Sequence, residues 1–87
     1  MPIALRLPKT FRVAGWKVKI QEKETTEPPH VSIVRGTQKW RLGLRDRRFM
    51  DRSPDPALIP KELLAEIDGN WNWLCKGWNR KYPKNPV

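Results

Sequence analysis

Alternating apolar and cationic residues in the middle of the chain predict an amphipathic β-strand. Residues 39–47 read Lys-Trp-Arg-Leu-Gly-Leu-Arg-Asp-Arg, so every second side chain from Trp40 to Leu44 is apolar. A period of two is that of a strand with one buried face, because successive side chains point to opposite sides. We therefore expect a strand over residues 37–47, with its cations on the face turned to solvent.

The same alternation predicts two or three further strands. Residues 11–21 place Trp16, Val18 and Ile20 on one face, and Ala14-Gly15 interrupts the pattern like a β-bulge. Residues 31–35 form the next strand, and the turn Gly36-Thr37 joins it to residues 37–47 as a hairpin. The segment 1–10 predicts an edge strand or an arm, because prolines bracket its short alternating run.

The C-terminal part of the chain predicts a helix over residues 60–81. Its apolar positions are spaced three or four apart and form one stripe, consisting of Leu64, Ile67, Trp71, Leu74 and Trp78. Two shorter helices broken at 68–70 are the alternative, but the stripe keeps its phase there and favours one helix. Prolines follow, so residues 82–87 are expected to be a loose tail.

These elements predict a single α+β domain over residues 1–87. Three or four antiparallel strands would form a small sheet, and one long C-terminal helix would pack on its apolar face. Residues 22–29, which contain a Pro-Pro pair, would be a polar loop. The opposite face of the sheet would then carry the cations Lys17, Lys19, Lys39, Arg41 and Arg45.

Composition restricts the partners. The chain carries 18 Lys and Arg against 9 Asp and Glu, a net charge of +9, which favours nucleic acid (RNA or DNA), an acidic protein or an anionic membrane surface. One Cys excludes an internal disulfide, and neither a secretory signal nor an apolar run long enough for a membrane span is visible. We therefore expect a cytoplasmic protein without a membrane partner.

The sequence shows no pattern for a cofactor or a metal. The glycines match no phosphate-binding loop, and a single Cys with a single His cannot build an ordinary structural zinc site within one chain. Cys75 borders the helix stripe and is expected to be an inert, buried thiol.

The predicted cationic face is the main candidate site. The residues expected to contact nucleic-acid phosphates are Lys17, Lys19, Lys39, Arg41, Arg45 and Arg47. Residues 35–52 hold seven cations and two acids, a net charge of +5. Since Trp16 and Trp40 would point to the core, backbone contact is favoured over base stacking. A merely solvated basic surface is the alternative.

Two aromatic residues have two interpretations each. His30 is the sole histidine and could be the general acid or base of a metal-independent ribonuclease, with cations steadying the phosphate. It could instead be a loop-end residue that hydrogen-bonds the backbone and packs on Pro29. Trp73 lies off the helix stripe. It would be either an exposed anchor for a partner or a side chain buried beneath the N-terminal segment.

Residues 27–31 read Glu-Pro-Pro-His-Val and precede the predicted hairpin and the Trp-bearing helix. This order resembles a family of small bacterial proteins of uncharacterised function, whose members carry Pro-Pro-His, two strands and a terminal helix. Such proteins are often encoded in toxin–antitoxin-like gene pairs. The family commonly has a second histidine where this chain has Ser32, so the resemblance implies no role that needs two imidazoles.

The sequence as a whole predicts a protein that binds an acidic partner, nucleic acid before protein, rather than an enzyme. A toxin-like ribonuclease using His30 is the second hypothesis. A module that binds a cognate small protein through Trp73 and the tail is the third.

Overall fold

A computed structural model describes residues 3–20 and 27–87 of the chain. Four strands and three α-helices are arranged in the order β1 (Ile3–Ala4), α1 (Lys9–Val13), β2 (Trp16–Ile20), β3 (His30–Arg35), β4 (Gln38–Gly43), α2 (Lys61–Gly69) and α3 (Trp71–Lys81), with a short 3₁₀ turn, Pro56–Leu58, before α2. The predicted α+β class with a small antiparallel sheet is therefore confirmed.

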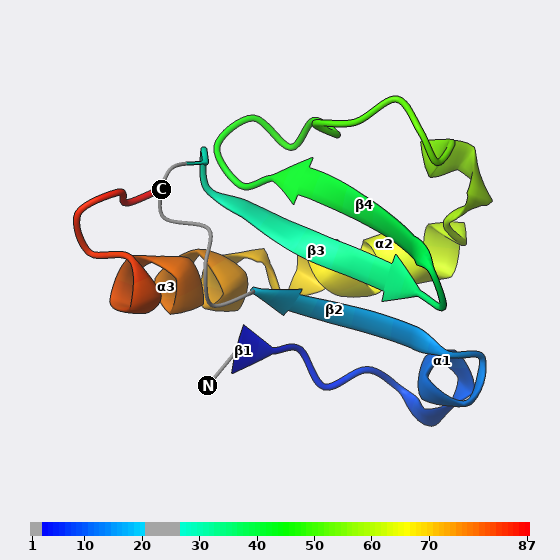
Figure 1. The fold of residues 1–87 in the computed structure, drawn as a ribbon. Coiled ribbons are helices and arrows are strands. Elements are labelled where there is room, and N and C mark those ends of the chain that lie inside the picture. The colour runs from blue at the N-terminus through cyan, green and yellow to red at the C-terminus, as the bar shows by residue number, and fades with distance from the viewer. Residues whose placement is uncertain (1–2, 21–26) are drawn as a thin grey trace.

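The four strands form one antiparallel sheet in the order β1-β2-β3-β4 (Figure 1). The predicted hairpin is present: β3 and β4 pair from His30 opposite Gly43 to Arg35 opposite Gln38. The positive φ of 61° at Gly36 turns the chain between them. β1 is an edge strand of two residues, which agrees with the predicted confinement of the N-terminal segment.

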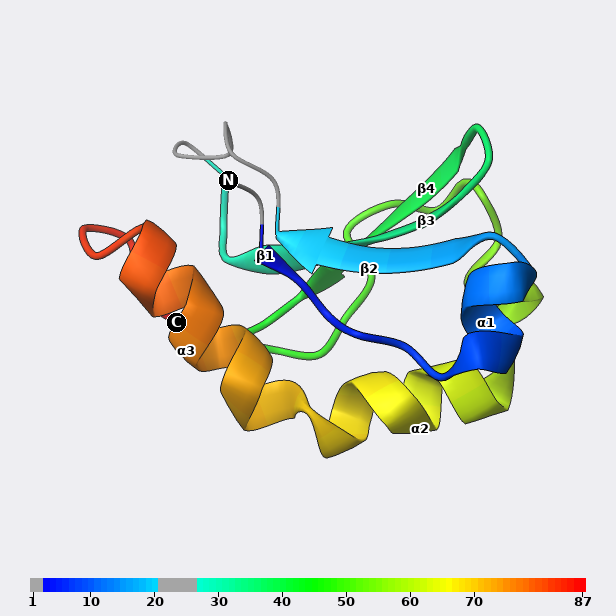
Figure 2. The same cartoon turned by 90° about the horizontal axis from the view of Figure 1, so that it is seen from below.

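The core lies between the sheet and the two C-terminal helices. Figure 2 shows α2 and α3 on one side of the sheet, meeting at an elbow. The apolar sheet face, as predicted, is buried there, including Trp16, Val18, Trp40 and Leu42, and Leu44, just after β4, is buried as well. Figure 1 looks onto the other face, which none of the described helices covers. We call this second surface the open face.

The prediction of one continuous helix is wrong, and the two-helix alternative is correct. The break falls at Asn70, whose φ is −112° and whose side-chain amide donates to the Glu66 carbonyl at 2.8 Å. Each helix then buries its own pair four residues apart, Leu63 with Ile67 and Leu74 with Trp78. The expected stripe is therefore only partly core, because Leu64 and Trp71 are half-buried.

Residues 9–13 form a short helix, so the predicted strand over 11–21 begins only at Trp16. Backbone amides of Phe11 and Arg12 donate to the Pro8 carbonyl, at 3.1 and 3.2 Å. Gly15, with φ of 93°, ends the turn in the left-handed region that glycine favours. What the sequence suggested as a bulge at Ala14-Gly15 is therefore the end of a helix.

β4 is shorter than the predicted strand over 37–47, because the chain folds back after Gly43. The Gly43 amide donates to the Arg48 carbonyl at 2.8 Å, and its own carbonyl accepts from the Arg47 amide at 3.1 Å. A Cβ at residue 43 would lie 2.5 Å from Asp46 Oδ1 and 3.2 Å from the Arg48 carbonyl oxygen, so a larger residue would displace the Asp46 side chain from this turn. Residues 44–47 consequently leave the sheet, and Arg45 and Arg47 with them.

The C-terminal tail is fastened to the body of the protein, which corrects the expectation of a loose end. Asn85 accepts a hydrogen bond from Trp78 Nε1 at its carbonyl, 2.6 Å away, and donates from Nδ2 to the Glu27 carbonyl at 2.9 Å. Tyr82 is buried with its ring centroid 4.4 Å from that of Trp78. Residues 82–87 are thus part of the fold.

Candidate nucleic-acid interface

The sheet register places four of the six predicted cations on the open face. Residues directly opposite in neighbouring strands share a face. Lys17, Val34 and Lys39 make one row across β2, β3 and β4, and Lys19, Ser32 and Arg41 make the next. Lys17 is exposed, whereas the other three cations are half-buried. The alternation in the sequence is therefore enough to bring these four together.

Arg41 is less available to contact a phosphate than its position on the open face suggests, because acidic side chains already bind its guanidinium. Its Nε and one terminal nitrogen donate to the two oxygens of Asp51 at 2.8 and 2.6 Å, and the other terminal nitrogen donates to Glu27 at 3.0 Å. The hydrogen bond from Arg41 lowers the pKa of Asp51, to which the Lys39 charge also contributes. Two carboxylates thus compensate the Arg41 charge, and both come from segments outside the sheet.

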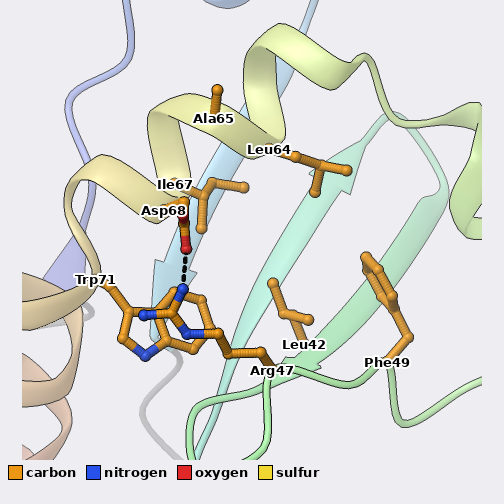
Figure 3. A pocket seen from close by; sticks show the side chains of 8 residues that line it. All are labelled: Leu42, Arg47, Phe49, Leu64, Ala65, Ile67, Asp68 and Trp71. Carbon is orange, nitrogen blue, oxygen red and sulfur yellow. Dashed lines mark hydrogen bonds and ion pairs between the residues drawn. The ribbon is translucent and has the colours of Figure 1, made fainter.

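Arg45 and Arg47 serve other contacts, so the prediction that they share the cationic sheet face is wrong. Arg45 donates to the Pro86 carbonyl at 2.6 Å and so holds the C-terminal tail. Arg47 pairs with Asp68 and lies over the ring of Trp71, 4.6 Å from its centroid. Figure 3 shows this stack beside a cleft of about 330 Å³, which Leu42 and Phe49 help to line.

A second cationic feature adjoins Lys17 and Lys19. β1 pairs with β2 through Ala4 opposite Lys19, and the Leu5 amide donates to the Val18 carbonyl at 2.8 Å. Beyond this point a cleft of about 330 Å³ opens between the segment 4–7 and β2. In the part of the chain that the structure describes, the charged residues that line it are all cations, namely Arg6, Arg12, Lys17 and Lys19. We call this cleft the basic groove.

Sequence reasoning missed Arg6 and Arg12 as site residues. The sequence does indicate Arg6, because the alternation in residues 3–7 predicts an edge strand. Pairing of that strand with β2 would place Arg6 near Lys17. The sequence predicts a strand at Arg12, and only the helix α1, which ends at Val13, brings Arg12 to the groove. No sequence pattern indicates Glu27 and Asp51 as partners of Arg41, because both residues lie outside regular secondary structure.

His30 is fully buried at the start of β3, which disfavours its proposed catalytic role. Nδ1 donates to the Pro28 carbonyl at 2.8 Å, and the ring centroid lies 5.6 Å from that of Trp78. Nε2 is 3.5 Å from Glu27 Oε2. A side chain with 0% exposure cannot touch a substrate in this conformation. The backbone bond agrees with the structural alternative.

Trp73 is exposed rather than buried beneath the N-terminal segment, and its role as an anchor for a partner stays a prediction. Its side chain is 48% exposed on α3, and it lines a hollow of about 270 Å³ with Ile3, Lys76, Gly77 and Arg80. Cys75, on the same helix, is half-buried, and burial raises the pKa of its thiol.

Residues 3–20 and 27–87 show neither a metal site nor a membrane-spanning helix. They contain no group of three or more His, Cys, Asp or Glu side chains that could hold a metal ion. No helix within these ranges is long and apolar enough to cross a membrane.

Comparison with family models, curated proteins and solved structures gives no match for this chain. The resemblance to the Pro-Pro-His family therefore stays a prediction, and the function has to be argued from the geometry.

Proposed function

We propose that this protein binds nucleic acid by its phosphates, through the basic groove and the adjoining part of the open face. The observation that carries the proposal is the charge of the groove, whose lining, among residues 3–20 and 27–87, holds four cations and no acid. Lys39 extends this charge across the sheet on the row of Lys17. Fixed cations in a concave surface attract polyanions strongly, because neutralised phosphates release their counterions.

The placement of the acids supports this choice over the rest of the basic surface. Glu27 and Asp51 hold Arg41, and Asp68 holds Arg47. Residues 35–52 carry a net charge of +5, but their cations make separate contacts in several places and do not gather on one face. Lys17, by contrast, is exposed beside Arg6 and Arg12, so the cationic field is best developed on the β1–β2 side of the sheet.

Contacts of this kind position a nucleic acid without reading its sequence. The tryptophans of the sheet, Trp16 and Trp40, are buried in the core and cannot stack on bases. Affinity should consequently vary little among oligonucleotides of equal length and different sequence.

The test is fluorescence anisotropy of a labelled oligonucleotide at several salt concentrations. Contact with four or five phosphates predicts a slope of log K against log salt of about −3 to −5. Lys17→Ala with Lys19→Ala should make that slope shallower by about one to two. The matched control is Arg48→Ala with Arg52→Ala, which removes the same charge from the segment after β4 and should leave the slope near the wild-type value. Absence of binding at low salt, or an equal effect of both pairs, would refute the proposal.

A further inference from the structure

The surface of α3 beside β1 offers a second, chemically different contact for the same ligand. Trp73 is 48% exposed there, whereas Trp16, Trp40 and Trp78 are 4% exposed or less. Trp71 is half-buried and its ring is covered by the Arg47 guanidinium. Trp73 is thus the tryptophan whose ring is available for stacking.

Cations accompany this ring at helical spacing. Lys76 and Arg80 follow Trp73 by three and seven residues, which places all three on one side of α3. Both cations are exposed. Residues 70–87 contain four Lys and Arg and no Asp or Glu, so no acid of this segment opposes them. An aromatic ring flanked by cations is the combination with which proteins hold single-stranded nucleic acid.

Glycine shapes the hollow between these side chains. A Cβ on Gly77 would lie 3.4 Å from Ile3 Cδ1, so the Ile3 side chain packs directly against the α3 backbone. Gly77 itself adds no side chain to the hollow between Trp73 and Arg80, and Ile3 is the other apolar residue that lines it. The volume of about 270 Å³ leaves room for a planar group against the Trp73 ring.

The hollow and the basic groove are neighbours across β1. Ile3 lines the hollow, while Ala4, the next residue, lines the groove and pairs with Lys19. A strand of two residues therefore separates a row of phosphate-binding cations from a stacking surface. A flexible polyanion that crosses this edge would contact both.

We propose that the Trp73 hollow binds an unpaired base, so that the ligand class is single-stranded nucleic acid. This inference rests on the proposed phosphate contacts of the basic groove. In a duplex the bases are stacked on one another and closed to the Trp73 ring, whereas a single strand can turn a base onto it. Single strands should consequently bind more tightly than duplexes of equal length.

The experiment compares a labelled oligothymidine with a duplex of equal length, using anisotropy at fixed salt. Trp73→Ala should weaken single-strand binding by about 5-fold to 150-fold, since stacking contributes about 1–3 kcal/mol per base. Trp73→Phe, which retains a ring, should recover much of the affinity. The neighbouring control Asn72→Ala should match wild type, and far-UV circular dichroism should be unchanged in all three variants. Oligothymidine should also quench part of the tryptophan emission of wild type, and less of it in Trp73→Ala.

The outcomes separate the inference from the function on which it rests. Salt-dependent binding that is equal in wild type and Trp73→Ala, or tighter for the duplex, would overturn the stacking site and leave the phosphate contacts standing. Loss of all binding at low salt would overturn both. Binding of an acidic protein that depends on Trp73, without any binding of oligothymidine, would assign the hollow to a protein partner and also overturn the inference.

Discussion

Replacement of Trp78 by Ala tests the packing of α3 against the sheet. The Trp78 side chain is 0% exposed, its ring lies 4.4 Å from Tyr82 and 5.6 Å from His30, and its Nε1 donates to the Asn85 carbonyl at 2.6 Å. Truncation of a buried Trp costs about 3–5 kcal/mol, because a cavity replaces the ring. A domain of this length has a total stability of about 4–13 kcal/mol. The variant should therefore be severely destabilised, and its C-terminal tail should be released.

Trp73→Ala is the matched control, since it makes the same chemical change five residues away on the same helix. Because Trp73 is 48% exposed, Trp73→Ala removes only about half as much buried surface, and the free energy of unfolding should fall by about 1–2 kcal/mol, less than for Trp78→Ala. Urea unfolding followed by far-UV circular dichroism measures both variants. If Trp78→Ala does not fold, Trp78→Phe should still fold and cost about 1–3 kcal/mol, because it leaves the Asn85 carbonyl without its donor. Equal stabilities for the Ala variants would refute the placement of α3.

Two further predictions concern the helix elbow and the Arg41 network. At Gly69 the φ angle is not positive, and no atom lies within 4 Å of the position that a Cβ would take. Gly69→Ala should therefore raise the free energy of unfolding by about 0.5–1 kcal/mol. A lower free energy of unfolding in urea for this variant would show that the elbow needs glycine. Arg41 lowers the pKa of Asp51 in the folded protein. The contribution of this carboxylate to stability is therefore fully present above the unfolded-state pKa of about 3.9, and it is lost as pH falls through the lower folded-state pKa. The free energy of unfolding of Asp51→Asn should therefore fall less than that of wild type between about pH 5 and 2. Urea unfolding at several pH values measures this difference, and identical pH profiles would exclude a link between Asp51 ionisation and stability.

Local periodicity predicted the sheet because register and burial in a strand both follow the period of two. The alternation from Trp16 to Ile20 and from Lys39 to Leu42 identified the buried face and placed Lys17, Lys19, Lys39 and Arg41 on the other. The same reliance on periodicity favoured one continuous helix over the correct alternative of two. The apolar spacing continues through Asn70, although the Asn70 side chain caps the end of α2 and starts a new helix direction.

The parts of the site that the sequence could not predict depend on contacts between distant segments. Arg41 is neutralised by Glu27 and Asp51, 14 and 10 residues away, and no local pattern specifies those distances. Arg45 left the sheet because Gly43 begins a turn, whereas the alternation continued past it. The exposure of Trp73 likewise depends on how closely β1 approaches α3 at Gly77, which is a matter of tertiary packing.

The most direct test of the proposed function is a nuclear magnetic resonance titration of the nitrogen-15-labelled protein with oligothymidine at low salt. Backbone amides of Arg6, Lys17, Lys19 and Lys39 should shift with increasing ligand, and the indole N–H of Trp73 should shift with them. The indole N–H of Trp40, which donates to the Asp55 carbonyl in the interior, should stay in place. Shifts confined to residues 45–52, or no shifts at all, would contradict the account.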